Sequence, residues 1–408
     1  MQFLQGNNLP RVKASNQSAI LRMIYYYGPL QRAEIAERLG LTLPTITTNI
    51  NKMLADSLVR EMDAPDMVGS TNGRRARLLG INPDACYFVG VEFRFRQWNI
   101  CVTDFCGRII ASKGGYVKDD NYENTMRKLS EGFLECLSDS RKTQEELCGV
   151  GICLPGLVDR ENGVLKVYAR QQWSNKRICE DFIRLTGYQG RVTMENSATA
   201  RGMGAQLFHW DELKNDQIFA YMVVSTGIAC PVFLNTSSYR GSVVGAGEAG
   251  HMIIDPHGRP CNCGNRGCLE AYASEEAIRN DCRKAMEQGR ASLLRTLCAD
   301  PKHPRISEIM EAQEAGDEDV CHILEDAIYM MSIGVNNIIN FTRPDVMLID
   351  CKLFGNKTNR HMLLSKAQNY LNSPAYSNTE ISFVEGDRLV GALGAVAVAI
   401  DEKLEHLT

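Results

Sequence analysis

One histidine and three cysteines are gathered within eighteen residues of the sequence, where they could bind a metal ion. They are His251, Cys261, Cys263 and Cys268. One imidazole and three thiolates are soft ligands, and four protein ligands leave no position for water, as in a closed structural Zn²⁺ site. Gly264 and Gly267 allow the backbone to fold back so that the thiolates can converge. We therefore predict a structural zinc site in the loop 251–268.

Two other kinds of site compete with zinc for these residues. An iron–sulfur cluster could use the thiolates, although the histidine disfavours it, and a disulfide could join two of the cysteines. The chain has an odd number of cysteines, fifteen, and its N-terminus lacks a signal-peptide pattern, so we expect a reducing cytoplasm that disfavours disulfides. The longest apolar stretch, near 390–400, is too short and too glycine-rich to span a bilayer, so we expect no membrane association.

Three helical patterns occupy the start of the chain. Apolar residues recur at helical spacing over 15–27, where Gly28 and Pro29 stop the helix. A second short helix is expected over 32–39, and a third begins near Pro44. Two helices joined by a tight turn that contains glycine are typical of a helix-turn-helix.

The third of these helices has a polar face that could enter a DNA groove. Its side chains are short hydroxyls and amides, with no acid before Asp56. Such side chains let a helix lie close in the major groove and reach base edges or phosphates. The alternative is the solvated face of an ordinary bundle helix, although such faces usually mix Glu with Lys. The predicted DNA contacts on this helix are Thr45, Thr47, Thr48, Asn49 and Lys52.

Two short strands, near 58–62 and 77–81, flank the segment GSTNGRRAR and predict a wing. Arg74 and Arg75 lie in that segment and could contact phosphates or an A·T-rich minor groove, unless the loop is basic but touches nothing. Residues 1–80 hold ten basic and six acidic residues, whereas the remainder holds 35 and 43. A positive head on a negative body is expected when one end of a chain meets nucleic acid.

The body of the chain alternates strands and helices. Strands are expected over 87–93, 98–105 and 107–116, followed by a helix over 124–138 and a strand over 148–156. A second half contains strands near 217–225, 229–235 and 345–350, with a long helical stretch over 274–340. This order predicts a duplicated α/β fold.

Four segments of this body resemble the ROK family (repressors, open reading frames and sugar kinases). They are GVGICLPGLVDRENGVL, VTMENSATARGMGA, the GEAGH at 247–251 and the CNCGNRGCLEAYAS at 261–274. The winged helix followed by GRRARLLGINP resembles the transcriptional-regulator branch, so the resemblance covers essentially the whole chain. It implies an α/β fold in which a winged helix-turn-helix at 1–82 precedes a two-lobed, actin-like domain of the sugar-kinase and Hsp70 type at 83–408, with a sugar cleft between the lobes.

The resemblance also implies a sugar site. The glutamates of GEAGH and GCLE would accept sugar hydroxyls, since an ionised carboxylate can accept two at once. His251 would both bind zinc and face the ligand, and Asn196 matches the amide that precedes the catalytic aspartate of the family. The alternative is that the two glutamates only support the metal ligands. The implied sugar contacts are Asn196, Ser197, Glu248, His251 and Glu270.

The segments that ROK kinases use for chemistry differ in this chain. Ser197 stands in place of the catalytic aspartate, and a serine hydroxyl cannot take a proton at neutral pH. Residues 92–96 replace the first phosphate loop with bulky side chains, 225–231 lacks two glycines of the second loop, and 350–352 replaces a glycine pair. We therefore expect that the chain is not a kinase.

These observations predict a sugar-responsive transcriptional regulator, by family analogy a repressor, that binds operator DNA as a homodimer or homotetramer. Two alternatives stay open: a bifunctional sugar kinase that also binds DNA, and a regulator whose DNA-binding end is controlled by a protein partner.

Overall fold

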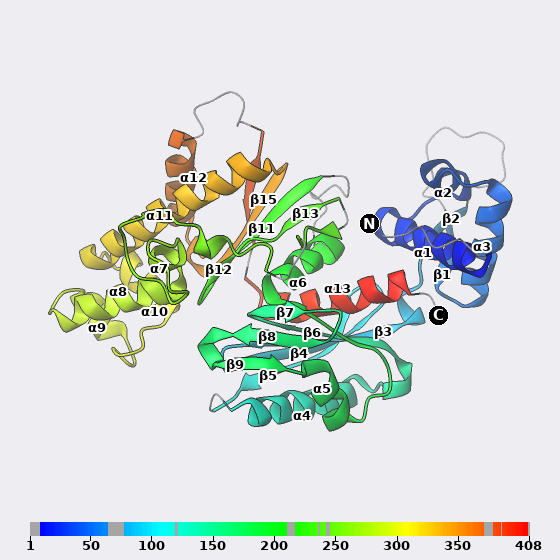
Figure 1. The fold of residues 1–408 in the computed structure, drawn as a ribbon, viewed down its shortest axis with the longest axis horizontal. Coiled ribbons are helices and arrows are strands. Elements are labelled where there is room, and N and C mark those ends of the chain that lie inside the picture. The colour runs from blue at the N-terminus through cyan, green and yellow to red at the C-terminus, as the bar shows by residue number, and fades with distance from the viewer. Residues whose placement is uncertain are drawn as a thin grey trace. The chain divides into compact units, whose positions relative to one another are not determined.

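A computed structural model describes residues 9–63, 77–118, 121–209, 217–235, 237–241, 245–370, 378–384 and 386–406 (Figure 1). The chain divides into two compact units. Unit 1 comprises Met1–Asp211 and Leu389–Thr408, and unit 2 comprises Glu212–Arg388. Unit 2 is thus an insertion in the sequence of unit 1. Among the described residues, no helix is both long and apolar enough to cross a lipid bilayer.

Unit 1 begins with the elements of the predicted winged helix. They are α1 (Leu9–Tyr27), α2 (Arg32–Leu39), α3 (Leu43–Ala55), β1 (Val59–Asp63) and β2 (Arg77–Ile81). Gly40 ends α2 in the left-handed conformation, with φ 61°, and Thr42 caps α3 by accepting the N–H of Thr45. Strands β1 and β2 pair antiparallel. The predicted helices and strands of this region are confirmed.

The rest of unit 1 is built on a five-stranded sheet in the order β10-β6-β3-β4-β5. The strands are β3 (Tyr87–Arg94), β4 (Gln97–Asp104), β5 (Ile109–Tyr116), β6 (Leu147–Leu154) and β10 (Val192–Asn196). β3, β4 and β5 pair antiparallel, whereas β6 runs parallel to both β3 and β10. A small three-stranded sheet consists of β7 (Leu157–Asp159), β8 (Val164–Tyr168) and β9 (Trp173–Lys176).

Helices cover both faces of the five-stranded sheet (Figure 1). They are α4 (Tyr122–Ser140) and α5 (Ile178–Thr186) on one face, and α6 (Ser197–Gly204) and α13 (Val390–Glu405) on the other. Helix α13 lies close to the backbone of the sheet: a Cβ at Gly90 would lie 1.9 Å from the carbonyl oxygen of Ala392, and one at Gly151 would lie 1.8 Å from that of Ala395. Only glycine at these two strand positions allows α13 to pack so closely.

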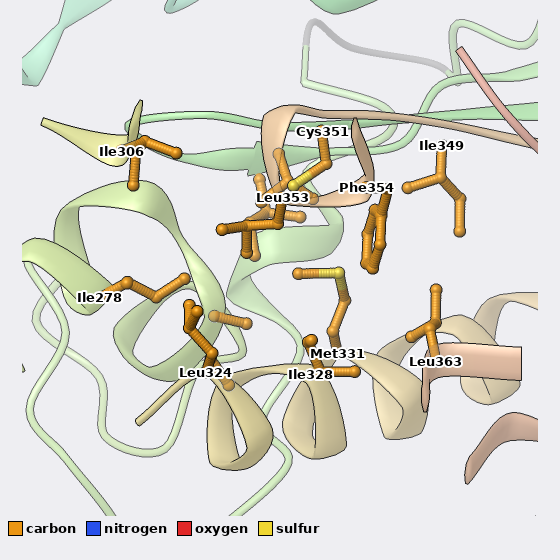
Figure 2. Packing of buried hydrophobic residues seen from close by; sticks show 14 of the residues in the cluster. Ile278, Ile306, Leu324, Ile328, Met331, Ile349, Cys351, Leu353, Phe354 and Leu363 are labelled. Carbon is orange, nitrogen blue, oxygen red and sulfur yellow. The ribbon is translucent and has the colours of Figure 1, made fainter. Parts of the chain in front are cut away.

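Unit 2 has a six-stranded sheet covered by helices. Its strands are β11 (Ile218–Val224), β12 (Ile228–Ala229), β13 (Val232–Leu234), β14 (Ser237–Ser238), β15 (Val346–Cys351) and β16 (Glu380–Phe383). Its helices are α7 (Glu270–Ala273), α8 (Glu275–Glu287), α9 (Ser292–Leu297), α10 (Ile306–Glu314), α11 (Glu318–Thr342) and α12 (Lys357–Tyr370). Figure 2 shows the core in which Leu324, Ile328 and Met331 of α11 pack toward the strand that ends at Cys351. The strands and the long helical stretch predicted for this half are confirmed.

Candidate functional site

The four predicted metal ligands converge in unit 2. Their ligand atoms all lie within 4.8 Å of one another. The Sγ of Cys261 is 3.8 Å from Nδ1 of His251, and the Sγ of Cys263 is 3.7 Å from that of Cys268. A tetrahedral zinc with Zn–S bonds of about 2.3 Å places its sulfur ligands about 3.8 Å apart. The donor set and the spacing of its atoms therefore fit a four-coordinate zinc ion.

The backbone of the loop folds back as the glycine positions predicted. Gly264 and Gly267 have φ of 92° and 73°. A Cβ at Gly267 would lie 1.6 Å from the carbonyl oxygen of Asp255, so a side chain there would prevent this fold. The N–H of Cys261 donates to the carbonyl of Asn265 at 2.8 Å, which closes the turn between two of the cysteines. These features bring the thiols close to one another.

Two glutamates lie beside this cluster. The carboxylate Oε2 of Glu248 is 4.0 Å from Nε2 of His251, the ring nitrogen that faces away from Cys261. The carboxylate Oε2 of Glu270 accepts the N–H of Ile228 at 3.1 Å. Burial raises the pKa of Glu248, and the charge of Glu270 raises it further, whereas His251 opposes the shift. The structure thus brings Glu248, His251 and Glu270 together, an arrangement that suits both sugar binding and support of the metal ligand.

The other two predicted sugar contacts belong to unit 1, at the turn between β10 and α6. Asn196 caps α6: its Oδ1 accepts the N–H of Ala198 at 2.8 Å, and its Nδ2 donates to the carbonyl of Gly156 at 2.9 Å. Ser197 is the first residue of α6. An amide side chain has two donor hydrogens and two acceptor lone pairs, so Asn196 keeps capacity for a ligand after making both bonds.

Segment 92–96, which the sequence predicts to differ from the first phosphate loop of ROK kinases, lies in a hairpin. It contributes Glu92 to a buried ion pair. Phe95 and Arg96 make the two-residue turn between β3 and β4, with φ of 31° and 64°. Glu92 accepts hydrogen bonds from Nη2 of Arg201 at 2.6 Å and from Nδ2 of Asn99 at 3.2 Å. Burial acts to raise the pKa of Glu92, but the charge of Arg201 and these hydrogen bonds lower it overall. No local sequence signal predicts this pairing, because Glu92 and Arg201 lie far apart in the chain.

The other two segments predicted to differ from kinase loops, 225–231 and 350–352, also contact neighbouring groups. In the turn 225–231, the N–H of Ser225 donates to the carbonyl of Gly227 at 2.9 Å, and a Cβ at Gly227 would lie 2.5 Å from Oε2 of Glu270. At the end of β15, Oδ2 of Asp350 accepts the hydroxyl of Tyr221 at 3.2 Å, and Cys351 is buried. Each segment is therefore held by contacts of its own.

The predicted DNA-binding residues of α3 divide between its exposed and buried faces. Thr47, Thr48 and Lys52 are exposed, and Thr45 is partly exposed. Asn49 is 4% exposed, and its Nδ2 donates to the carbonyl of Thr45 at 2.8 Å. The interpretation of Asn49 as an exposed groove-facing residue is therefore corrected: it lies on the inner stripe with Ile46, Ile50 and Met53. Arg74 and Arg75 lie outside the described residues.

Two families of known proteins match the two parts of the chain. The model of the ROK family matches residues 90–402. The model of the MarR family matches residues 14–66.

Two bacterial regulators are similar to nearly the whole chain. The xylose repressor of Bacillus subtilis (strain 168) is 28% identical over 401 residues, which cover 97% of this chain and 98% of the relative. The DNA-binding transcriptional dual regulator NagC of Escherichia coli (strain K12) is 25% identical over 348 residues, with 85% of this chain and 82% of the relative covered.

Solved structures share the fold. A ROK family transcriptional regulator described as a homologue of the E. coli Mlc protein superposes with a TM-score of 0.79 at 20% identity, and the match covers 97% of this chain and 98% of the other. A ROK family glucokinase from Streptomyces griseus in complex with glucose and AMPPNP superposes with a TM-score of 0.65 at 19% identity, covering 76% and 98%. The kinase match covers a smaller share of this chain than the regulator match.

Proposed function

The chain belongs to the ROK family, and from that premise we propose that it is a sugar-responsive transcriptional repressor that binds operator DNA through its N-terminal winged helix. The observation that carries the proposal is the presence of a MarR-type winged helix and a ROK domain in one chain, together with the match to the B. subtilis xylose repressor over 97% of this chain and 98% of the relative. We assign residues 1–82 to the DNA-binding domain and 83–408 to the sugar-binding domain.

The proposed effector is a sugar. Glu248, His251 and Glu270 are the proposed contacts of unit 2, because two carboxylates and an imidazole in one place can accept and orient several hydroxyls. Asn196 and Ser197 are the proposed contacts of unit 1. Relatives named for xylose and for N-acetylglucosamine supply the first sugars to test.

The proposed zinc ion is structural. Bound by His251 and three thiolates, it would fix the loop 251–268 and with it the two glutamates on either side of that loop. The support for this assignment is the donor set and the close spacing of its atoms.

We propose that the chain does not transfer phosphoryl groups. A kinase needs a base for the sugar hydroxyl and a cradle for the phosphates. Ser197 is a poor base at neutral pH, and the only carboxylate in segment 92–96 is paired with Arg201. The test is ADP release from purified protein with ATP, Mg²⁺ and either D-xylose or N-acetyl-D-glucosamine. Turnover that disappears in Glu248→Gln would overturn the proposal.

The proposed DNA contacts are the exposed polar residues of α3 and the two arginines of the wing. They are Thr45, Thr47, Thr48, Lys52, Arg74 and Arg75. To release an operator, the sugar must favour the state that does not bind DNA by about 10- to 100-fold, which is roughly 1.4–2.7 kcal/mol.

The experiment that tests the function measures binding of the purified protein to the DNA upstream of its own gene, with and without a panel of free and phosphorylated sugars. We expect one sugar to weaken DNA binding at fixed salt. Tight DNA binding that no sugar changes would instead support control by a protein partner. No DNA binding in any condition would contradict the repressor assignment.

A further inference from the structure

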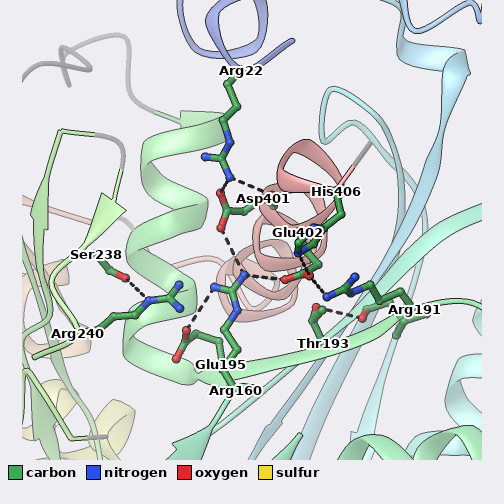
Figure 3. A network of polar contacts seen from close by, with 11 residues as sticks. Arg22, Arg160, Arg191, Thr193, Glu195, Ser238, Arg240, Asp401, Glu402 and His406 are labelled. Carbon is green, nitrogen blue, oxygen red and sulfur yellow. Dashed lines mark hydrogen bonds and ion pairs between the residues drawn. The ribbon is translucent and has the colours of Figure 1, made fainter. Parts of the chain in front are cut away.

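Within unit 1, a network of charged side chains links the turn at Asn196 to the first helix of the winged helix (Figure 3). Its members are Arg22, Arg160, Arg191, Glu195, Asp401 and Glu402. Three guanidinium groups face three carboxylates, so the set is balanced in charge. No local sequence signal predicts this set, since its members come from four separate segments of the polypeptide and only Asp401 and Glu402 are adjacent.

The centre of this network is nearly closed to solvent. The side chains of Arg160, Glu195, Asp401 and Glu402 are only 10–12% exposed. Nη2 of Arg160 lies 3.1 Å from Oε2 of Glu402 and 3.4 Å from Oδ2 of Asp401. The other oxygen of Asp401, Oδ1, lies 2.8 Å from Nη2 of Arg22. Asp401 therefore bridges two arginines with its two oxygens, and ion pairs this buried are screened little by solvent or salt.

The end near Asn196 is tied to Arg160 in two ways. Oε1 of Glu195 accepts the N–H of Asn196 at 2.8 Å, while Oε2 of the same carboxylate lies 3.8 Å from Nη1 of Arg160. Arg160 also follows directly after β7, and the carbonyl of Gly156, just before β7, accepts Nδ2 of Asn196. A movement of this turn must therefore change the surroundings of Arg160.

The opposite end reaches the DNA-binding head. Arg22 lies on α1, whose residues Ile20 and Ile24 pack in one core cluster with Ile46 and Ile50 of α3. The hydroxyl of Ser18 donates to a carbonyl on α13, a second tie between α1 and the helix that carries Asp401. A displacement of Asp401 would therefore be passed to α1 and from there to the helix proposed to contact DNA.

One contact in this network, between Arg160 and Glu195, is longer than a hydrogen bond. Nη1 of Arg160 is buried and has no hydrogen-bond partner among the residues that the structure describes. Its distance of 3.8 Å from Glu195 is too long for a hydrogen bond. A buried N–H without a partner costs free energy, so a small shift of Glu195 toward Arg160 would be favoured. That shift of Glu195 would be a second arrangement of these charged side chains.

We propose that Arg160 and Asp401 are positioning residues that couple the turn at Asn196 to α1. This inference rests on the proposed function and deepens it: sugar contact at Asn196 moves Glu195 toward Arg160, Arg160 shifts its Nη2 between Asp401 and Glu402, and Arg22 carries the shift into the winged helix. The proposal requires two discrete arrangements that both ligands bias.

The first test needs no ligand. Hydrogen exchange measured by mass spectrometry would compare the parent protein with Arg22→Gln and Asp401→Asn, over the segments 158–162 and 192–198. The matched control is Arg184→Gln, which breaks the exposed Arg184–Asp181 pair (2.7 Å) of α5 in the same unit. We expect exchange in both segments to change by about threefold or more in the two variants and to stay unchanged in the control. Exchange equal to that of the control would overturn the proposal.

The second test measures the response. Operator affinity is determined with and without D-xylose or N-acetyl-D-glucosamine, and affinity for the sugar is measured by calorimetry on the same samples. In Arg22→Gln we expect sugar affinity within about threefold of the parent but a sugar effect on DNA binding at least about fivefold smaller. An undiminished effect would overturn the coupling. If the parent bound neither sugar, these two sugars would be excluded as the effector, and the exchange experiment would still decide the coupling.

Discussion

The carboxylate of Glu92 and the guanidinium of Arg201 form an ion pair with side chains only 2% and 6% exposed. Breaking such a pair from one side leaves the other charge buried and uncompensated, which costs more than the pair contributes. Loss of either partner alone would therefore destabilise the fold.

We expect Glu92→Gln to lower the free energy of unfolding by about 3–5 kcal/mol, because Arg201 would remain charged and buried. Urea denaturation followed by circular dichroism measures the change. The control is Glu131→Gln, which removes one partner of the exposed Lys128–Glu131 pair (2.6 Å) and should cost less than about 1 kcal/mol. Equal effects from the two substitutions would contradict this view of the pair.

Asn49 and Thr47 separate stability from DNA binding on one helix. We expect Asn49→Ala to lower the free energy of unfolding by about 1–2 kcal/mol, since the hydrogen bond of its buried amide to Thr45 is lost. We expect Thr47→Ala to leave stability unchanged within about 0.5 kcal/mol and to weaken operator binding. Thermal unfolding and a DNA titration on the same two proteins make the comparison. A loss of stability in Thr47→Ala would place that side chain in the core.

At this scale the sequence predicted that His251 and three cysteines come together, as they do in the structure, but not the orientation of Asn49. Asn49 follows Ile46 by three positions and precedes Met53 by four, so helical periodicity already places it on the apolar stripe. Its polarity led to the opposite interpretation. Likewise, no local pattern reveals that Glu92 meets Arg201, because their contact depends on how β3 and α6 pack.

At the scale of elements, the loop 251–268 depends on its proposed ion. We expect Cys263→Ser to reduce zinc content from about one ion per chain toward zero and to lower the melting temperature, because metal binding contributes to folding. Elemental analysis gives the stoichiometry. Cys321→Ser serves as the control, since Cys321 lies on α11 outside the cluster. Unchanged zinc in Cys263→Ser would show that the ligand set is wrong.

The wing is the second element that a substitution can test. We expect the double substitution Arg74→Ala and Arg75→Ala to weaken DNA binding and to flatten its salt dependence by about 0.9 per lost phosphate contact. Titrations at several salt concentrations measure both. As a control, Arg177→Ala with Arg184→Ala removes two exposed arginines, one at the N-terminal cap of α5 and one within α5. This control protein has the same net charge as the wing variant. Equal affinities for the two double variants would contradict the wing assignment.

Most elements of the fold could be predicted from the sequence, because hydrophobic periodicity and the residues that stop helices are local signals. The helices α1–α3, the strands β1–β6 and the strand β15 all follow such signals. The small sheet of β7, β8 and β9 was not foreseen, since its short strands alternate weakly. The placement of α13 against β3 and β6 was not foreseen either, because it depends on contacts between segments about 240–300 residues apart.

At the scale of the whole molecule, the prediction concerns how two winged helices meet DNA. We expect the protein to bind as a homodimer, or as a tetramer of such dimers, to a palindrome whose half-sites are separated by about 10 bp or a multiple of it. Light scattering with and without DNA gives the stoichiometry, and footprinting gives the spacing. A monomer on a single half-site would contradict the expectation.

The family, and with it the proposed function, could be predicted from sequence because its motifs are continuous segments around 195–200, 247–251 and 261–274. The charged network from Glu195 to Arg22 could not be predicted from sequence, since it joins α1, the residue after β7, the end of β10 and α13. Signals that pass between domains depend on contacts of this kind, which no single segment encodes.

The position of α13 also constrains how a newly made chain can mature. The ribosome completes β3 and β6 early, but the helix that packs over Gly90 and Gly151 emerges only after the whole of unit 2 has been synthesised. Until then, one face of that sheet lacks α13, and α1 lacks its partners Leu404 and Asp401. A polypeptide released early would therefore expose apolar surface that chaperones and proteases recognise, so a fragment with a winged helix but no sugar response would not accumulate in the cell.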